Sequence, residues 1–317
     1  MNAKKKIVWF LLMMFIFGTS IQTFAQAAKF VNVKQITTDN LRYANPVWSP
    51  DGKMFTYSKE DLSGLFLADV ATLKKTKLTE DLGAGYQYKW SLDNKSIVYR
   101  ATTSDNTDSK QYVAIVNIDG KKEIVSNNYD RIQTPYWNYS GTNKEVMLIE
   151  PNQKPLMTKR SAIKSTSTNS NNTQNLNKFP YFKDEKLYMV DTKGNFTLVN
   201  DAPSYNVVIS PDGKKMAFNE IDNLVVMNID GTSKKYLGYG HKPSWLNNTQ
   251  LLYEVTTDDG EKYTSGDIYK ININGKEKIN ITNTKDKIEM NVSCSSDGKK
   301  VLYVEHKSGK IYMATLQ

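Results

Sequence analysis

The sequence predicts an all-β fold made of a repeated four-stranded sheet, and three observations carry the prediction. The chain of 317 residues contains 19 Tyr, 11 Phe and 5 Trp, and such residues favour strands over helices. A turn motif recurs along the chain. Two further strand-like segments follow most copies of the motif. With 24% charged and 39% apolar residues, the composition excludes both a disordered polymer and a multi-spanning membrane protein.

The first 25 residues predict an export signal. Lys4, Lys5 and Lys6 precede the apolar run Ile7–Gly18, and Ala25 ends a stretch with small residues where a signal peptidase cleaves. The run is shorter than the ~20 residues that cross a bilayer as a helix. We therefore expect cleavage after Ala25 and a periplasmic or secreted protein, without a lipid anchor because no Cys lies near the cleavage point.

The repeated motif predicts a hairpin between a first and a second strand. Two full copies, at 47–53 and 208–214, end in Ser-Pro-Asp-Gly-Lys. Proline presets φ for a turn and glycine accepts positive φ, so the chain reverses there. The degenerate copies are Trp90–Lys95, Trp137–Gly141, Trp245–Asn248 and Cys294–Lys299.

A third and a fourth strand are expected after these hairpins. The predicted third strands are 64–69, 113–118, 186–191, 224–229 and 267–272, and the fourth strands are 77–79, 123–125, 197–199, 235–237 and 279–282. The interval from Trp137 to Ile209 is longer than the others. We interpret residues 151–178, which include a Ser/Thr/Asn run, as a flexible insertion.

The last unit lacks a fourth strand after its third, at 310–314, and Val33–Thr37 matches the missing pattern. Pairing the two ends would close the array and remove exposed sheet edges. The prediction for residues 26–317 is therefore one six-bladed β-propeller of four-stranded antiparallel blades, closed by an N-terminal strand that completes the last blade.

These units resemble the WD40-like (PD40) repeats of TolB-like propellers, most clearly in the Trp-Ser-Pro-Asp-Gly-Lys stretch at 48–53. The resemblance covers residues 31–317 and implies a propeller without the additional N-terminal domain of TolB. It implies a location in the cell envelope and a binding platform, a peptidase gate or, rarely, a lyase.

One face of the predicted propeller carries long loops, at 37–46, 79–87, 101–111, 126–135, 255–267 and 282–290; we call it the loop face. Long loops on a rigid scaffold often carry function. Five loops entering first strands each contribute a tyrosine, at Tyr43, Tyr86, Tyr129, Tyr205 and Tyr239. These rings could grip a peptide or stack on a sugar, or they could fill the seams between blades.

All arginines also fall on this face or in the insertion, at Arg42, Arg100, Arg131 and Arg160. Arginine suits bidentate contact with a carboxylate or phosphate, although random placement explains the pattern equally well. We name Arg42 and Arg131 as binding candidates together with the five tyrosines and His241, which lies beside Tyr239. No basic stripe is present, so nucleic acid is not expected as a partner.

No catalytic or metal-binding constellation is evident. The chain has two His and one Cys, and it lacks a Gly-x-Ser-x-Gly elbow. Cys294 takes the place of the repeat tryptophan, which predicts a buried packing residue. Lyases of the family that resemble oligogalacturonate lyase hold a metal with several histidines, and this sequence cannot supply such a cluster. We expect no enzyme activity, cofactor or metal. The favoured function is a monomeric scaffold that binds an envelope protein or a peptide; the alternative is a carbohydrate-active propeller, either a glycan binder or a lyase-like protein.

Overall fold

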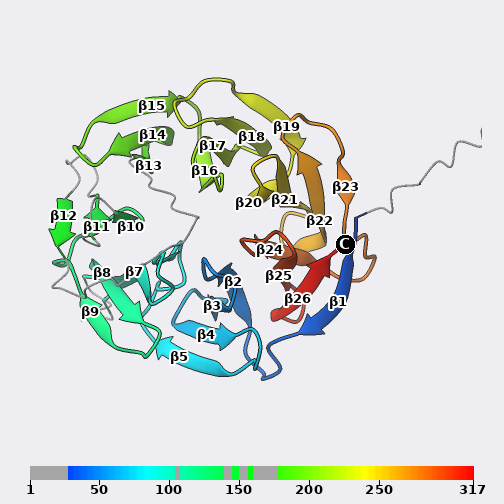
Figure 1. The fold of residues 1–317 in the computed structure, drawn as a ribbon, viewed down its shortest axis with the longest axis horizontal. Coiled ribbons are helices and arrows are strands. Elements are labelled where there is room, and N and C mark those ends of the chain that lie inside the picture. The colour runs from blue at the N-terminus through cyan, green and yellow to red at the C-terminus, as the bar shows by residue number, and fades with distance from the viewer. Residues whose placement is uncertain (1–27, 104–107, 139–144, 150–155, 160–177) are drawn as a thin grey trace, which may run out of the picture.

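Strands are the regular elements throughout the parts of the chain that the computed structural model describes, which are residues 28–103, 108–138, 145–149, 156–159 and 178–317. They form seven antiparallel sheets arranged around a ring (Figure 1). Five sheets have four strands and two have three. The expected signal segment lies outside the described residues.

We letter the sheets by their strands. Sheet B is β2(Tyr43–Trp48), β3(Met54–Lys59), β4(Leu65–Asp69) and β5(Lys75–Thr79), and sheet C is β6(Lys89–Trp90), β7(Ser96–Thr102), β8(Gln111–Asn117) and β9(Lys122–Ile124). Sheet D is β10(Tyr136–Asn138), β11(Glu145–Leu148) and β12(Leu156–Lys159), and sheet E is β13(Lys178–Lys183), β14(Lys186–Asp191) and β15(Phe196–Asn200). Sheet F is β16(Ser204–Ile209), β17(Lys215–Glu220), β18(Asn223–Asn228) and β19(Lys235–Tyr239). Sheet G is β20(His241–Asn247), β21(Gln250–Asp258), β22(Tyr263–Asn272) and β23(Ile279–Asn280), and sheet A is β24(Glu289–Cys294), β25(Lys300–Glu305), β26(Lys310–Leu316) and β1(Phe30–Gln35).

The propeller and its six repeats are confirmed, and the structure adds one sheet to the expected count. Six sheets begin with an inner strand that carries a copy of the repeat, whereas sheet E has none and lies in the long interval before Ile209. Its hairpin turns through Asp184 and Glu185 and lacks the Pro-Asp-Gly signal. Part of the predicted insertion is also a strand, because β12 pairs with β11. Residues 150–155 and 160–177 lie outside the described residues.

The repeat motif forms a hydrogen-bonded turn. Ser49 donates its Oγ proton to Asp51 Oδ1 at 2.7 Å and accepts the Met54 backbone N–H at 3.0 Å, while Gly52 has a φ of 67°. The same Ser-to-Asp contact recurs in sheets C, F and A. Serine and aspartate thus hold the turn, and its last residue takes positive φ, as glycine at Gly52 and as asparagine at Asn94.

The repeat tryptophans join neighbouring sheets. Trp48 Nε1 donates to the Ser293 carbonyl at 3.0 Å, and Trp137 Nε1 donates to the Lys89 carbonyl at 3.1 Å. Trp245 makes the matching bond to Val208. In sheet A the position holds Cys294, which packs into the apolar cluster between sheets G and A; burial raises the pKa of its thiol to about 12.

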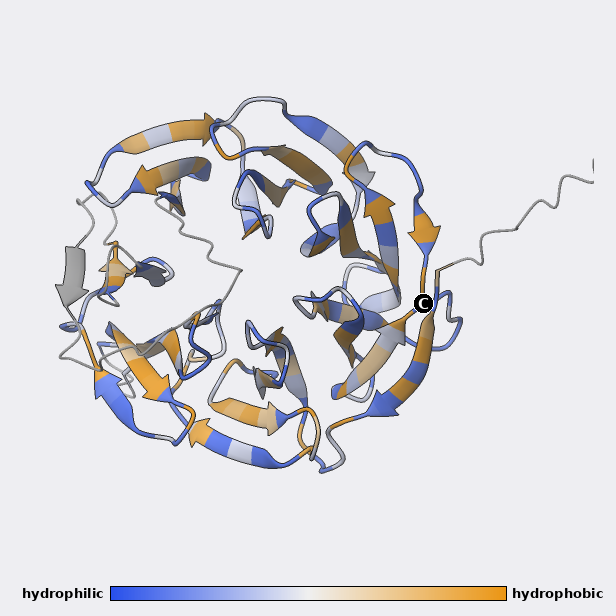
Figure 2. Ribbon diagram, viewed as in Figure 1, coloured by the Kyte–Doolittle hydropathy of each residue, from blue (hydrophilic) through white to orange (hydrophobic). Residues whose placement is uncertain are grey.

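The core is divided among the seams, with one apolar cluster between each pair of neighbouring sheets of the described ring. Apolar residues gather on middle strands such as β8, and the connecting turns are hydrophilic (Figure 2). This pattern stabilises each sheet through both of its neighbours.

The predicted closure is confirmed. β1 pairs antiparallel with β26, from Phe30 opposite Leu316 to Gln35 opposite Tyr312. Ile36, directly after β1, is 3% exposed and packs in the cluster between sheets A and B. The N-terminal strand thus completes sheet A.

Candidate binding site

Several inner strands have one residue with positive φ near their start. The bulge at this residue sets the direction of the neighbouring side chains. Asn45, Asn206, Lys242 and Asn291 have φ between 46° and 55° and lie at bulges in β2, β16, β20 and β24, and Gln87, with a φ of 53°, precedes β6. Bulges of this kind bend a strand and redirect its side chains.

Several of these residues connect one sheet to the next. Asn45 Nδ2 donates to the Gly85 carbonyl at 3.1 Å, and Lys242 Nζ donates to Asn291 Oδ1 at 2.7 Å. Gln87 Oε1 accepts the Thr134 hydroxyl at 2.6 Å. The loop face is therefore tied together by side-chain hydrogen bonds between sheets.

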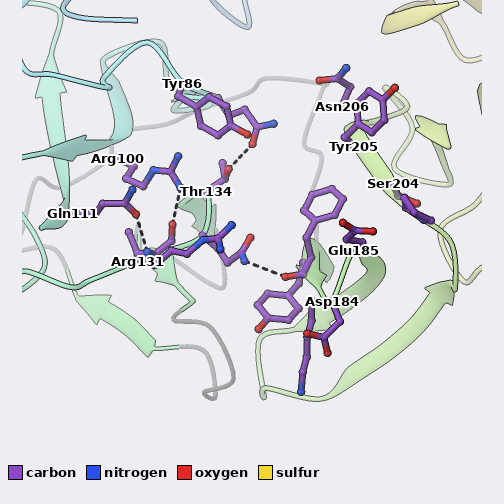
Figure 3. A pocket seen from close by; sticks show the side chains of 17 residues that line it. Tyr86, Arg100, Gln111, Arg131, Thr134, Asp184, Glu185, Ser204, Tyr205 and Asn206 are labelled. Atoms are coloured by element: carbon purple, nitrogen blue, oxygen red, sulfur yellow. Dashed lines mark hydrogen bonds between the residues drawn. The ribbon is translucent and has the colours of Figure 1, made fainter. Parts of the chain in front are cut away.

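A pocket of about 850 Å³ opens on the loop face between sheets C, D, E and F (Figure 3). Its wall is formed by the loop before β6, the strands β7 and β8, the loop before β10, the β13–β14 turn and the start of β16. The volume lies in the range of ordinary ligand sites. The charged and aromatic residues among those lining it are Tyr86, Arg100, Arg131, Tyr181, Phe182, Lys183, Asp184, Glu185 and Tyr205.

Two arginines form one side of this pocket. Arg100, on β7, donates from Nη1 to the Ile132 carbonyl at 2.7 Å, and its guanidinium carbon lies 4.8 Å from the centre of the Tyr86 ring. Burial lowers the pKa of Arg100, and the positive charge of Arg131 lowers it further. Neither arginine forms an ion pair with a carboxylate of the described residues, so the positive charge facing the pocket is not neutralised locally.

Amide side chains fix the floor of the pocket. Gln111 Oε1 accepts the Ile132 backbone N–H at 2.9 Å, and Gln133 Nε2 donates to the Phe182 carbonyl at 3.0 Å. These bonds join sheet D to sheets C and E. The loop that carries Arg131 is thus anchored on both sides.

The opposite side of the pocket carries two carboxylates and one ammonium group, those of Asp184, Glu185 and Lys183. Asp184 and Glu185 form the two-residue turn between β13 and β14, with Lys183 paired to Lys186 across it. Both turn residues are exposed, and Figure 3 shows their carboxylates across the pocket from the arginines. The two carboxylates of the site therefore lie across from its arginines, although Lys183 lines the pocket next to them in the chain.

Three of the predicted binding residues line this pocket, namely Tyr86, Arg131 and Tyr205. Tyr86 and Tyr205 are 41% and 38% exposed. The Tyr205 hydroxyl donates to the Ile221 carbonyl, which fixes the ring at the rim.

Tyr43 follows the seam interpretation. It is 4% exposed, meets Tyr57 edge-on with ring centres 5.1 Å apart, and donates its hydroxyl to Asp39 Oδ2 at 2.8 Å. Burial and the Asp39 carboxylate raise the pKa of Tyr43. Its side chain is therefore part of the core between sheets A and B.

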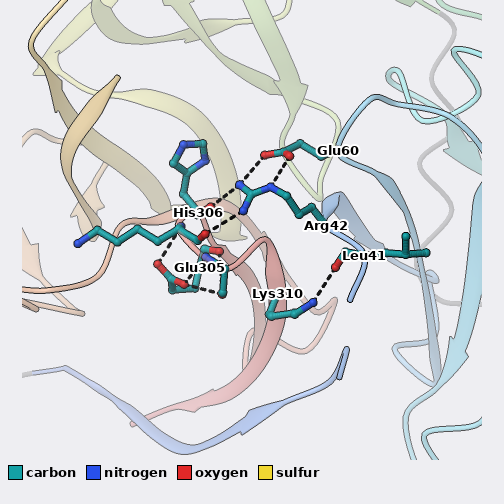
Figure 4. A network of polar contacts seen from close by, with 8 residues as sticks. Leu41, Arg42, Glu60, Glu305, His306 and Lys310 are labelled. Atoms are coloured by element: carbon teal, nitrogen blue, oxygen red, sulfur yellow. Dashed lines mark hydrogen bonds and ion pairs between the residues drawn. The ribbon is translucent and has the colours of Figure 1, made fainter. Parts of the chain in front are cut away.

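Arg42 joins the ends of the propeller (Figure 4). Its Nε and Nη2 bind the Glu60 carboxylate at 2.5 and 2.8 Å, and Nη1 and Nη2 donate to the Lys307 and His306 carbonyls at 2.8 and 2.6 Å. Each of its nitrogen atoms thus has a partner within the protein, and the side chain holds sheet B to sheet A.

The remaining candidates lie away from the pocket. Tyr129 is half-buried against the cluster between sheets C and D. Tyr239 and His241 contact each other edge-on, with ring centres 5.1 Å apart, at the junction of sheets F and G. Tyr239 is 44% exposed and donates its hydroxyl to the Thr256 carbonyl at 2.6 Å.

Sequence reasoning missed the acidic wall and the glutamines. Asp184 and Glu185 belong to the seventh sheet, which no repeat motif marks. The expected long loop at 255–267 is mostly strand. β21 and β22 stay paired as far as Asp258 and Tyr263, so only a short turn joins them. Arg100 was recognised on the loop face but not as a binding candidate.

The described residues lack two further features. They contain no group of three or more His, Cys, Asp or Glu placed to hold a metal ion. In the same part of the chain, no helix has the length and apolar character needed to span a membrane.

Comparison with protein-family models and with curated proteins finds no match to the sequence. Among solved structures, the chain is similar to the putative TolB from Agrobacterium tumefaciens, with a TM-score of 0.51 and 13% identity over 91% of this chain and 98% of that one. It is also similar to TolB from Acinetobacter baumannii, with a TM-score of 0.47 and 15% identity. That alignment covers 89% of this chain but only 56% of the other protein. An oligogalacturonate lyase in complex with manganese gives a TM-score of 0.49 and 14% identity, over 90% and 80% of the two chains. At such identities the likeness concerns the fold, and it agrees with the TolB-like propeller expected from the repeats.

Proposed function

We propose that the protein is an exported, non-catalytic scaffold whose loop face binds a segment of another envelope protein or a peptide. The proposed site is the pocket between sheets C and F. Export rests on the N-terminal sequence pattern, and the scaffold role rests on a closed ring of sheets with a pocket lined by charged and aromatic residues.

The proposal rests on one observation: neither Arg100 nor Arg131 is paired with a carboxylate of the described residues. A guanidinium offers five N–H donors, and Arg100 uses one of them for the Ile132 carbonyl. Arg131 is exposed and lines the same pocket. Arginine and tyrosine are among the residue types most enriched at the hot spots of protein interfaces.

A carbohydrate-active propeller is the second candidate. Tyr86 and Tyr205 are exposed at the rim, where a flat ring with a polar tip also suits a sugar. The acidic wall at Asp184 and Glu185 favours a peptide over an acidic glycan, because like charges repel.

The test compares a pocket variant with a matched surface variant. Arg131→Ala/Tyr205→Ala changes one exposed cation and one exposed ring at the pocket, whereas Lys193→Ala/Leu198→Ala changes an exposed cation and an exposed apolar residue on sheet E outside it. The purified proteins are used to capture partners from envelope extracts and to probe a glycan array.

We expect the wild type and the surface variant to capture the same protein or peptide and the pocket variant to lose it. Equal capture by the pocket variant would place the binding surface elsewhere. Binding of wild type to glycans alone, lost in the pocket variant, would favour the carbohydrate-active alternative.

A further inference from the structure

We propose that the pocket recognises the C-terminal end of a peptide. The α-carboxylate binds Arg100 and Arg131, and a basic side chain near the end of the peptide binds Asp184 and Glu185. This inference rests on the proposed function and specifies its ligand.

The arginine wall is preorganised for a carboxylate. Arg100 is held by the Tyr86 ring and by its bond to the Ile132 carbonyl, which leaves its other donors available. Figure 3 shows Arg100 and Arg131 on the same side of the pocket, which both of them line. A carboxylate has two oxygens and matches the planar fork of a guanidinium, so one such group can bind both arginines.

Arg42 shows how the same chain saturates an arginine that has a structural role. Its guanidinium binds one carboxylate and two backbone carbonyls. Arg100 and Arg131 lack the carboxylate within the described residues. A ligand carboxylate would supply the missing partner.

The acidic wall is built on a strained turn. Asp184 and Glu185 have φ of 50° and 62°, the conformation of a tight hairpin turn that usually takes Asn-Gly. No hydrogen bond or ion pair engages either carboxylate within the described part of the chain, and the adjacent Lys186 pairs with Asp201 at 2.5 Å instead. The turn thus places two carboxylates that have no hydrogen bond across from the arginines, with Lys183 next to them in the chain, at a conformational cost.

The two walls together select a ligand of mixed charge. A chain with repeated negative groups, such as an acidic glycan, would satisfy the arginines but meet repulsion at Asp184 and Glu185. A peptide end carries one terminal carboxylate and can place a lysine or arginine a few residues away. Tyr86, Tyr181 and Tyr205 would contact the side chains between them.

The test uses an array of random octapeptides made in two forms, one with a free C-terminal carboxylate and one with a C-terminal amide. We expect wild-type protein to bind the free acids and to prefer sequences with Lys or Arg before the terminus. For the best sequence, fluorescence anisotropy should show the acid binding about tenfold or more tightly than the amide, as expected for a charge-assisted contact.

Variants separate the two walls. Arg131→Gln should reduce the preference for the acid over the amide to less than about threefold, and Arg131→Lys should restore only part of it. Glu185→Gln should remove the preference for a basic residue while keeping the preference for the acid. Lys193→Gln, a charge change outside the pocket, should alter neither preference.

Each other outcome overturns the inference in a distinct way. Equal binding of acids and amides, sensitive to Arg131→Gln, would leave the peptide-binding scaffold standing without carboxylate recognition. Absence of binding to either form would overturn the inference, while capture from envelope extracts would still test the scaffold role. Binding of trigalacturonate that exceeds every peptide, and that strengthens in Glu185→Gln, would replace the peptide with an acidic glycan.

Discussion

Two regions of the propeller use arginine in opposite ways. At the seam between sheets A and B, where the chain ends meet, the guanidinium of Arg42 is fully bound inside the protein. In the sector from sheet C to sheet F, Arg131 lies in a similar loop before an inner strand and lines a pocket.

The tyrosines divide in the same way, since Tyr43 is buried at the closure seam and Tyr86 and Tyr205 are exposed in the pocket sector. A residue type at a repeated position therefore does not determine its role. Contacts with the neighbouring sheet determine whether the side chain is buried between sheets or exposed in the pocket.

The largest expected effect tests how far stability depends on the closure seam. Ile36→Ala should lower the free energy of unfolding by about 2–5 kcal/mol, because it opens a cavity in the cluster between sheets A and B. The control Val33→Ala, on the same segment but 48% exposed, should change it by about 0.5 kcal/mol or less. Urea unfolding measures both; equal values would mean that the N-terminal segment contributes little at this seam.

Gly309→Ala should also weaken the closure seam, by about 2–3 kcal/mol in the same measurement. Gly309 has a φ of 66°, and a Cβ there would lie 2.6 Å from Arg42 Cβ. Gly120→Ala is the control, since its φ is 85° but no heavy atom lies within 4 Å of the added Cβ. The control should show only the conformational cost of about 1–2 kcal/mol; an equal loss in both would exclude a packing contribution at Gly309.

Substitution of Arg42 and of Arg131 should change the free energy of unfolding by different but smaller amounts. Arg42→Ala should cost about 1–2 kcal/mol, since two backbone carbonyls and Glu60 lose a charged donor, although the partly exposed ion pair adds little. Arg131→Ala should change unfolding by about 0.5 kcal/mol or less. A destabilisation by Arg131→Ala as large as that by Arg42→Ala would show that both regions use arginine structurally.

The smallest effect is a pH dependence at the closure seam. Hydrogen bonding to Arg42 lowers the pKa of Glu60 below the usual value of a glutamate. A lowered carboxyl pKa stabilises the folded state above the unfolded pKa, and this stabilisation is lost as pH falls through the folded pKa.

Glu60→Gln should therefore destabilise the protein at pH 7 and at pH 5.5, by less than about 1 kcal/mol because the pair is exposed, and should have a smaller effect at pH 3. Parallel urea titrations of wild type and variant measure the difference. A difference that grows on acidification would contradict the assigned role of Arg42.

Much of the fold could be predicted because its turns require particular residues. The contact of Ser49 with Asp51, repeated in three other sheets, leaves a visible motif in the sequence. The seventh sheet leaves none, since its hairpin uses Asp184 and Glu185 in a conformation that those residues do not signal.

The site could be predicted only to the level of a face. Loop positions place Tyr86, Arg131 and Tyr205 on one side of the ring, and the pocket lies there. The aromatic ring of Tyr43 contacts Tyr57 and Phe66, which lie on two other strands of sheet B. These contacts form only when the sheet is folded. Burial of one tyrosine and exposure of another therefore depend on contacts between segments far apart in the sequence.

The pairing of Phe30 with Leu316 sets an order on folding. β1 has to wait for β26, which is synthesised long after it, so sheet A cannot be completed before β26 exists. Contacts between such distant segments slow folding, because the long intervening loop must close before the strands pair. Until β26 is available, β1 has no neighbouring strand, and its unpaired backbone groups can pair with another chain.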